Sequence, residues 1–100
     1  VWSAPGGQAA PNALAAAKRC GLTHVRWTDA GMLGDELPSD RYPNDLLLAR
    51  ALRSLRDGDV MMMHLGIRSR KEPLAPILDP LLGELKSRGF CFATIGKGPV

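Results

Sequence analysis

The sequence has little cysteine, and its two cysteines are far apart. Cys20 and Cys91 form no CxxC pair, which argues against a structural zinc site. Free cysteine is among the most buried residue types in proteins. We therefore expect two separate buried thiols rather than a disulfide.

Long apolar runs and several catalytic motifs are also missing. No run approaches the roughly 18 apolar residues that a membrane helix needs, and no signal peptide opens the chain. The motifs GxSxG and HExxH are absent, and the glycines of "APGGQAAPN" fit neither GxGxxG nor the P-loop. The net charge of +3 is spread along the chain. We expect no membrane span and no nucleic-acid partner.

The composition is that of an ordinary globular protein. Hydrophobic residues make up 45% and charged residues 23% of the 100 residues, which allows one domain at most. The chain opens at Val1 on "VWSAPGG", which is typical of the middle of a domain. We therefore expect residues 1–100 to be a fragment of a larger domain.

Three glycines predict an α/β protein with a parallel sheet. Each follows a helical pattern and precedes a short apolar run: "AAAKRCG" before "LTHVRW", "RSLRDG" before "DVMMMH", and "LKSRG" before "FCFATI". A glycine just past a helix end supplies the left-handed backbone that terminates the helix. Three such units in series are typical of parallel sheets, whose strands alternate with helices.

The apolar spacing sets approximate bounds for these units. We expect helices from Pro11 to about Arg19, from an N-cap near Asn44, and from about Leu74 to Arg88, with a kink or late start at Pro80. The expected strands are Thr23–Thr28, Asp59–His64 and Phe90–Ile95. Three parallel strands leave two open edges, so we expect further strands outside this chain.

Asp29 and His64 are the candidate catalytic residues. Each stands where an expected strand ends, and ligands of parallel α/β folds bind beyond the carboxyl ends of the strands. Each also has a structural interpretation: Asp29 as an acceptor for loop N–H groups, and His64 as the end of a buried strand. The basic run Arg68, Arg70 and Lys71 fits an anionic substrate less well than a solvated loop.

Four stretches together resemble one enzyme family. "WSAPGGQAAPNALAAAKRCG" is similar to an R-x-P-x-G motif and its following helix, and "VRWTDAGML" to a tryptophan strand ending in D-x-x-D-W. "GDVMMMHLG" is similar to L-x-H after a Gly-Asp turn, and "LLGELKSRGFCFATI" to a closing helix and strand. Their order resembles the C-terminal half of the polysaccharide deacetylases, carbohydrate esterase family 4, over nearly the whole chain.

The resemblance implies a fold, a cofactor and a reaction. The fold would be the C-terminal portion of a distorted (β/α) barrel. A divalent metal, zinc in many members, would be held by ligands upstream of Val1. The activity would be hydrolysis of acetyl groups on an N- or O-acetylated polysaccharide or oligosaccharide, outside the cytoplasm, at the cell envelope or secreted.

The resemblance also implies roles for single residues. His64 would be the general acid, and Met62 would line the pocket for the acetyl methyl group. Gly6 and Gly7 would bind substrate, with the backbone N–H of Gly6 stabilising the oxyanion. Trp27 would contact the substrate as well.

The sequence departs from the family pattern at three positions. Ser3 replaces the usual arginine, and Met32 and Leu33 replace the Asp-Trp pair whose aspartate assists the acid histidine. Asp29 would take over that role, since a carboxylate beside an imidazole favours the proton-donating form. The alternative is a non-catalytic carbohydrate-binding or structural relative of the same fold.

Overall fold

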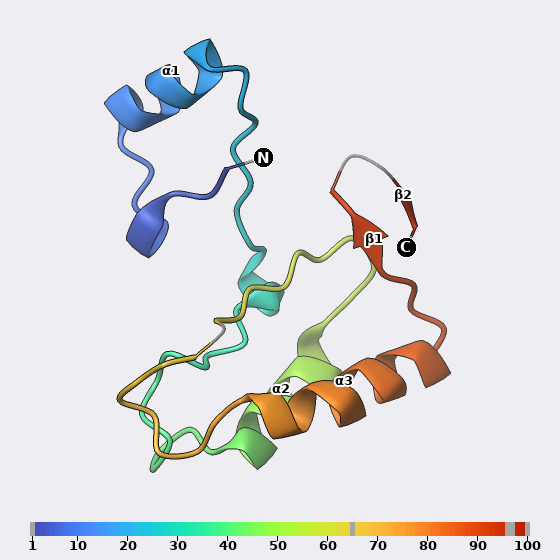
Figure 1. The fold of residues 1–100 in the computed structure, drawn as a ribbon. Helices are drawn as coiled ribbons and strands as arrows, with labels where there is room; N and C mark the ends of the chain where they lie inside the picture. The colour runs from blue at the N-terminus through green and yellow to red at the C-terminus, as the bar shows by residue number, and fades with distance from the viewer. Residues whose placement is uncertain (1, 65, 96–97, 100) are drawn as a thin grey trace.

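The structure is a computed structural model that describes residues 2–64, 66–95 and 98–99. Its elements in chain order are η1 (Pro5–Gly7), α1 (Pro11–Arg19), η2 (Asp29–Gly31), α2 (Asn44–Ser54), α3 (Ala75–Ser87), β1 (Ala93–Thr94) and β2 (Gly98–Pro99). Figure 1 shows α2 and α3 lying side by side, with α1 apart from them at the other end of the molecule.

The three expected helices are confirmed, but α2 ends at Ser54 and not at Gly58, because Leu55 is already extended. Gly21 and Gly89 follow α1 and α3 with φ of 72° and 93°. The residue after each glycine donates its N–H to the carbonyl of the third-last helical residue. Leu22 donates to Ala17, and Phe90 donates to Leu85. This is a Schellman ending. Pro80 lies inside α3 without interrupting it.

The start of α2 differs from the prediction, because Asn44 is its first helical residue and not its N-cap. The N-cap is Pro43, which offers no capping side chain. Instead, the Glu72 carboxylate accepts the Asn44 N–H at 3.2 Å. A carboxylate at this end also complements the helix dipole.

The predicted parallel sheet is wrong, and so is the expected portion of a (β/α) barrel. In the described part of the chain the one sheet is an antiparallel pair of two-residue strands, β1 and β2. In the described structure Thr23–Thr28 and Asp59–His64 form no ladder, and Phe90–Ile95 contributes only the two residues of β1. Among the residues that the structure describes, parallel pairing is limited to two single bridges, Trp2 with His24 and Met32 with Met62.

The sheet prediction failed because an apolar run does not specify which segment a strand pairs with. A parallel ladder needs evenly spaced hydrogen bonds along both strands. The segment that contains Val60 meets Thr28 and Gly31 through single backbone hydrogen bonds, because the chain turns into η2 after Thr28. Ala93 and Thr94 pair with Gly98 and Pro99 instead of with the other segments.

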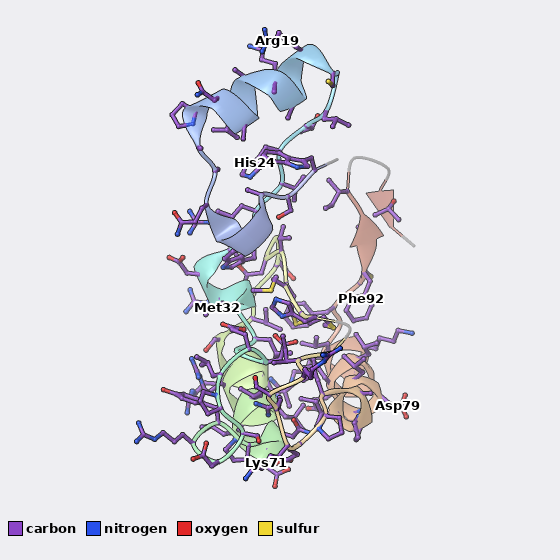
Figure 2. The ribbon with its side chains drawn as sticks, turned by 60° about the vertical axis from the view of Figure 1, so that its left-hand side comes forward. Arg19, His24, Met32, Lys71, Asp79 and Phe92 are labelled. Atoms are coloured by element: carbon purple, nitrogen blue, oxygen red, sulfur yellow. The ribbon has the colours of Figure 1, made fainter. Side chains whose placement is uncertain are left out.

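The hydrophobic core lies between α2 and α3. Leu47 and Leu81 are fully buried at its centre. The buried cluster comprises Leu33, Leu47, Ala51, Leu74, Ile77, Leu81 and Leu85. Figure 2 shows Asp79 on the outer side of α3 and Phe92 beyond its end, and Phe92 packs against the cluster.

The N-terminal part adds little core. Ala17 is the one buried residue of α1, and Trp2 stacks on His24 with ring centroids 5.1 Å apart. Cys20 and Cys91 are free, but both are exposed, so the expectation of buried thiols is wrong. None of the described helices has the length and apolar character to cross a membrane.

Asp59 links the segment before η2 to the segment before His64 through hydrogen bonds. Its carboxylate accepts the Arg56 N–H and the Thr28 hydroxyl, both at 2.8 Å. These two bonds, the backbone one first, lower the pKa of Asp59 below its ordinary value of 3.8. The Thr28 hydroxyl in turn accepts the Val60 N–H at 3.2 Å.

Replacing Leu81 by alanine should destabilise the protein strongly. Emptying a fully buried leucine site costs about 2–5 kcal/mol, measured as the loss in free energy of unfolding in urea. Leu82→Ala is the matched control on the same helix, since Leu82 is 37% exposed, and its loss should be clearly smaller. Equal losses for both variants would contradict the core described above.

Asp59→Asn should cost stability in a pH-dependent way. Because the folded state lowers the pKa of Asp59, its stabilisation is present above pH 3.8 and disappears as the pH falls through the lowered value. The gap between wild type and variant in denaturant midpoint should therefore be larger at pH 7 than at pH 3. Asp57→Asn, at an exposed neighbour, should show a gap that depends less on pH.

Candidate functional site

His64 and Asp35 form a hydrogen-bonded pair at the surface. The ring Nδ1 of His64 lies 3.0 Å from Asp35 Oδ1, and the His64 backbone N–H donates to Asp35 Oδ2 at 2.6 Å. The Asp35 side chain is 1% exposed and that of His64 is 39% exposed. An ionised carboxylate only accepts, so the pairing places a proton on Nδ1 and leaves Nε2 for chemistry.

The Met32–Met62 bridge brings the two residues together. Met62 donates its N–H to the Gly31 carbonyl at 2.9 Å, and from this bridge the two segments continue in parallel. Asp35 lies three residues after Met32, and His64 lies two residues after Met62. Figure 2 shows Met32 midway between the α1 end and the α2–α3 end of the molecule.

Gly34 gives the turn that directs Asp35 inward. Its φ is 96°, in the region that favours glycine. A Cβ atom at this position would lie 3.3 Å from side-chain atoms of both Leu37 and Leu47. The turn therefore passes close over the core, and Asp35 is buried beside it.

Arg70 fastens the segment that follows Asp35. Its guanidinium donates to the carbonyls of Leu37 and Tyr42 at 2.9 and 2.8 Å and to Asn44 Oδ1 at 2.9 Å. The residue is 8% exposed. Three fixed donors from one buried side chain hold this loop against the segment that begins at His64. The interpretation of Arg70 as part of a solvated loop is therefore wrong.

Asp29 does not pair with His64, although the sequence suggested that it assists this histidine. It is exposed at the start of η2. Its carboxylate makes no hydrogen bond or ion pair within residues 2–64, 66–95 and 98–99. His64 is paired with Asp35 instead. The carboxylate that pairs with His64 is therefore Asp35, which the sequence analysis did not select.

Gly7 and Trp27 are brought together, although not beside His64. A Cβ atom on Gly7 would lie 2.6 Å from the Trp27 ring, so only glycine fits beneath the indole. Gly6 and Gly7 both have positive φ, of 65° and 71°. The Gly7 N–H already donates to the Ala4 carbonyl at 3.0 Å. Gly6 is exposed.

Trp27 and Met62 share a depression of about 330 Å³. It is lined by Trp2, Ser3, Val25, Arg26, Trp27, Val60, Met61, Met62, Met63 and Ile95. His64 lines a separate cavity of about 120 Å³ together with Asp35. The structure therefore places Trp27 and Met62 in one hollow and His64 in another, and Asp29, Gly6 and Gly7 are in the lining of neither.

Asp35, Glu36 and His64 form a group that could be considered for a metal ion. One ligand atom from each lies within 4.8 Å of the others. However, both Asp35 oxygens already accept hydrogen bonds from His64, and one of these bonds uses the ring Nδ1. A metal at Asp35 would have to replace the bonds that satisfy a buried carboxylate. The donor set therefore fits an acid–base pair better than a metal centre.

No protein-family model, curated protein or solved structure matches this chain. The resemblance to polysaccharide deacetylases therefore stays a prediction. The assignment of chemistry to this chain rests on the geometry of its own residues.

The sequence did contain a weak signal for Asp35. It lies in the unusually long connection between Asp29 and Asn44, and loops of that length commonly carry function. Selecting it from among the acidic residues of the loop required the register of the Met32–Met62 bridge. That register is known only from the tertiary structure.

The pair predicts one tautomer for the neutral His64 ring. Ring ¹⁵N NMR should show the Nδ1–H form as the major one, because the Asp35 carboxylate accepts that proton. In Asp35→Asn, the amide group can also donate to Nδ1, so the preference should weaken. The His64 backbone amide should also exchange faster with solvent. Asp79→Asn, at an exposed site on α3, is the matched control. A major Nε2–H form in wild type would contradict the pairing.

Proposed function

We propose that His64 and Asp35 form the acid–base pair of a hydrolase that removes acetyl groups from a glycan. One observation carries the proposal: a buried carboxylate holds both the backbone and the ring of a solvent-exposed histidine. The paired Nδ1 fixes the orientation of the ring, and Nε2 is free to exchange protons with a bound molecule. Asp35 is a positioning residue in this scheme.

The proposed step is protonation of the leaving group. Hydrolysis of an acetamide or acetyl ester joins the oxygen of water to the acetyl carbon and breaks the bond to nitrogen or oxygen. The attacking water loses its proton to the solvent, the protonated His64 ring gives its Nε2 proton to the departing amine or alkoxide, and acetate and the free sugar group result. The neighbouring Asp35 carboxylate offsets the positive charge while the ring is protonated.

The apolar depression supports a sugar ligand. Trp27 and Met62 offer apolar surface there, and aromatic and apolar walls are common in small-molecule sites. The divalent metal implied by the resemblance belongs to this proposal, and the Asp35, Glu36 and His64 group gives it no support. No step is assigned to the metal.

His64→Ala in the full-length protein should lower acetate release about 100-fold or more, as expected for a lost general acid. The substrates are an N-acetylated chitooligosaccharide and an O-acetylated oligosaccharide, and the readout is acetate in solution. His24→Ala is the matched histidine control, and it should keep much more activity. Near-normal acetate release by the His64 variant would overturn the role.

A second comparison tests whether Asp35 or Asp29 orients His64. It also tests whether the chain is an enzyme or a carbohydrate-binding module. Asp35→Asn should lower acetate release more than Asp29→Asn, and the reverse order would return the orienting role to Asp29. If the wild-type protein binds the acetylated oligosaccharides without releasing acetate, the chain acts as a carbohydrate-binding module. That result would replace the enzymatic proposal.

A further inference from the structure

Arg26 is the one charged residue in the described lining of the depression at Trp27. Its side chain is exposed, so a ligand in the depression can reach it. Within residues 2–64, 66–95 and 98–99 this side chain makes no hydrogen bond or ion pair. The same lining holds no carboxylate. The depression therefore offers an unpaired cation on an otherwise neutral surface.

Trp27 keeps this cation at the edge of the depression. The Arg26 guanidinium carbon lies 5.4 Å from the centroid of the Trp27 ring, and a cation at this distance is attracted by the aromatic face. The ring is itself seated against Gly7, where a Cβ atom would lie 2.6 Å from it. A guanidinium has five N–H donors, and a contact with one ring leaves donors for a ligand.

Trp2 adds a second aromatic wall that is also held in position. Its N–H donates to the Thr23 carbonyl at 2.8 Å, and its carbonyl accepts the Val25 N–H at 2.7 Å. Its ring stacks on His24 with centroids 5.1 Å apart. Aromatic and apolar walls with few polar groups are typical of small-molecule sites, and the volume of about 330 Å³ lies within their range of about 300–1,000 Å³.

We propose that this depression binds a sugar unit that carries a carboxylate, a uronic acid of the acetylated glycan. The apolar face of the sugar ring would pack on the aromatic and methionine side chains. Two N–H groups of Arg26 would donate to the two carboxylate oxygens, the planar geometry in which arginine binds this group. One arginine with no second cation in the lining suits a single negative charge.

Arg26 is then the residue that determines specificity for an acidic glycan. Met62 lines the depression, and His64 follows it two residues later in the separate cavity. The acidic unit would therefore be a neighbour of the acetylated unit along the glycan. This inference rests on the proposed function for the choice of a sugar ligand, and it needs no turnover.

Intrinsic fluorescence tests the inference directly, because both tryptophans of the chain, Trp2 and Trp27, line the depression. The full-length protein is titrated with a tetrasaccharide of alternating N-acetylglucosamine and glucuronic acid, and with the neutral tetrasaccharide of N-acetylglucosamine. The acidic sugar should bind about three- to fivefold more tightly, as expected for an exposed charge pair. Added sodium chloride should reduce this preference.

Three variants separate this inference from the proposed reaction. Arg26→Gln should bind the two tetrasaccharides equally, with the neutral one bound as by wild type. Arg19→Gln makes the same change at an exposed arginine at the α1 end of the molecule (Figure 2) and should keep the preference. His64→Ala should also keep it, although acetate release is lost.

Three results would overturn the inference: equal affinities in wild type, a preference that persists in Arg26→Gln, or no fluorescence change with either sugar. Loss of the preference in His64→Ala would also overturn it, because the acidic unit would then lie at His64. A wild-type preference without acetate release would overturn the hydrolase alone.

Discussion

The burial of the Asp35 carboxylate is the constraint on which the site depends. A carboxylate that is 1% exposed must be satisfied by hydrogen bonds, since a buried charge without partners is strongly unfavourable. Both partners come from His64, one from its backbone and one from its ring. The same two bonds that satisfy the buried charge fix the position of an exposed imidazole. One contact thus serves both the stability of the buried charge and the chemistry proposed for His64.

Arg70 solves a related problem for the loop after Asp35. The segment from Leu37 to Asn44 crosses the surface with carbonyl groups that no ladder uses, and the guanidinium fork donates to two of them. A planar group with five donors suits this task better than a lysine ammonium.

The two hollows have different characters. The depression at Trp27 is mostly apolar, and the cavity at His64 combines an imidazole, a carboxylate and a guanidinium. Met62 lies in the first hollow, and His64, two residues later in the chain, lies in the second. A single segment therefore connects an apolar contact surface with the imidazole of His64. This connection is the structural basis for proposing both sugar contact and acid–base chemistry.

The sequence by itself determined the helices, and it supplied His64 as the candidate for the reactive residue. Apolar spacing and the glycines after α1 and α3 are local signals, because helix hydrogen bonds and helix endings join residues only a few positions apart. His64 was selected because it ends an expected strand, and the described part of the chain forms no such strand there. The tertiary structure decided which segments pair, and it replaced the parallel sheet by single bridges and a short antiparallel pair. It also decided that Asp35 and not Asp29 meets His64, since that depends on the register between segments about 30 residues apart. Such register is set by packing and by the cost of burying charge, and no local pattern encodes it.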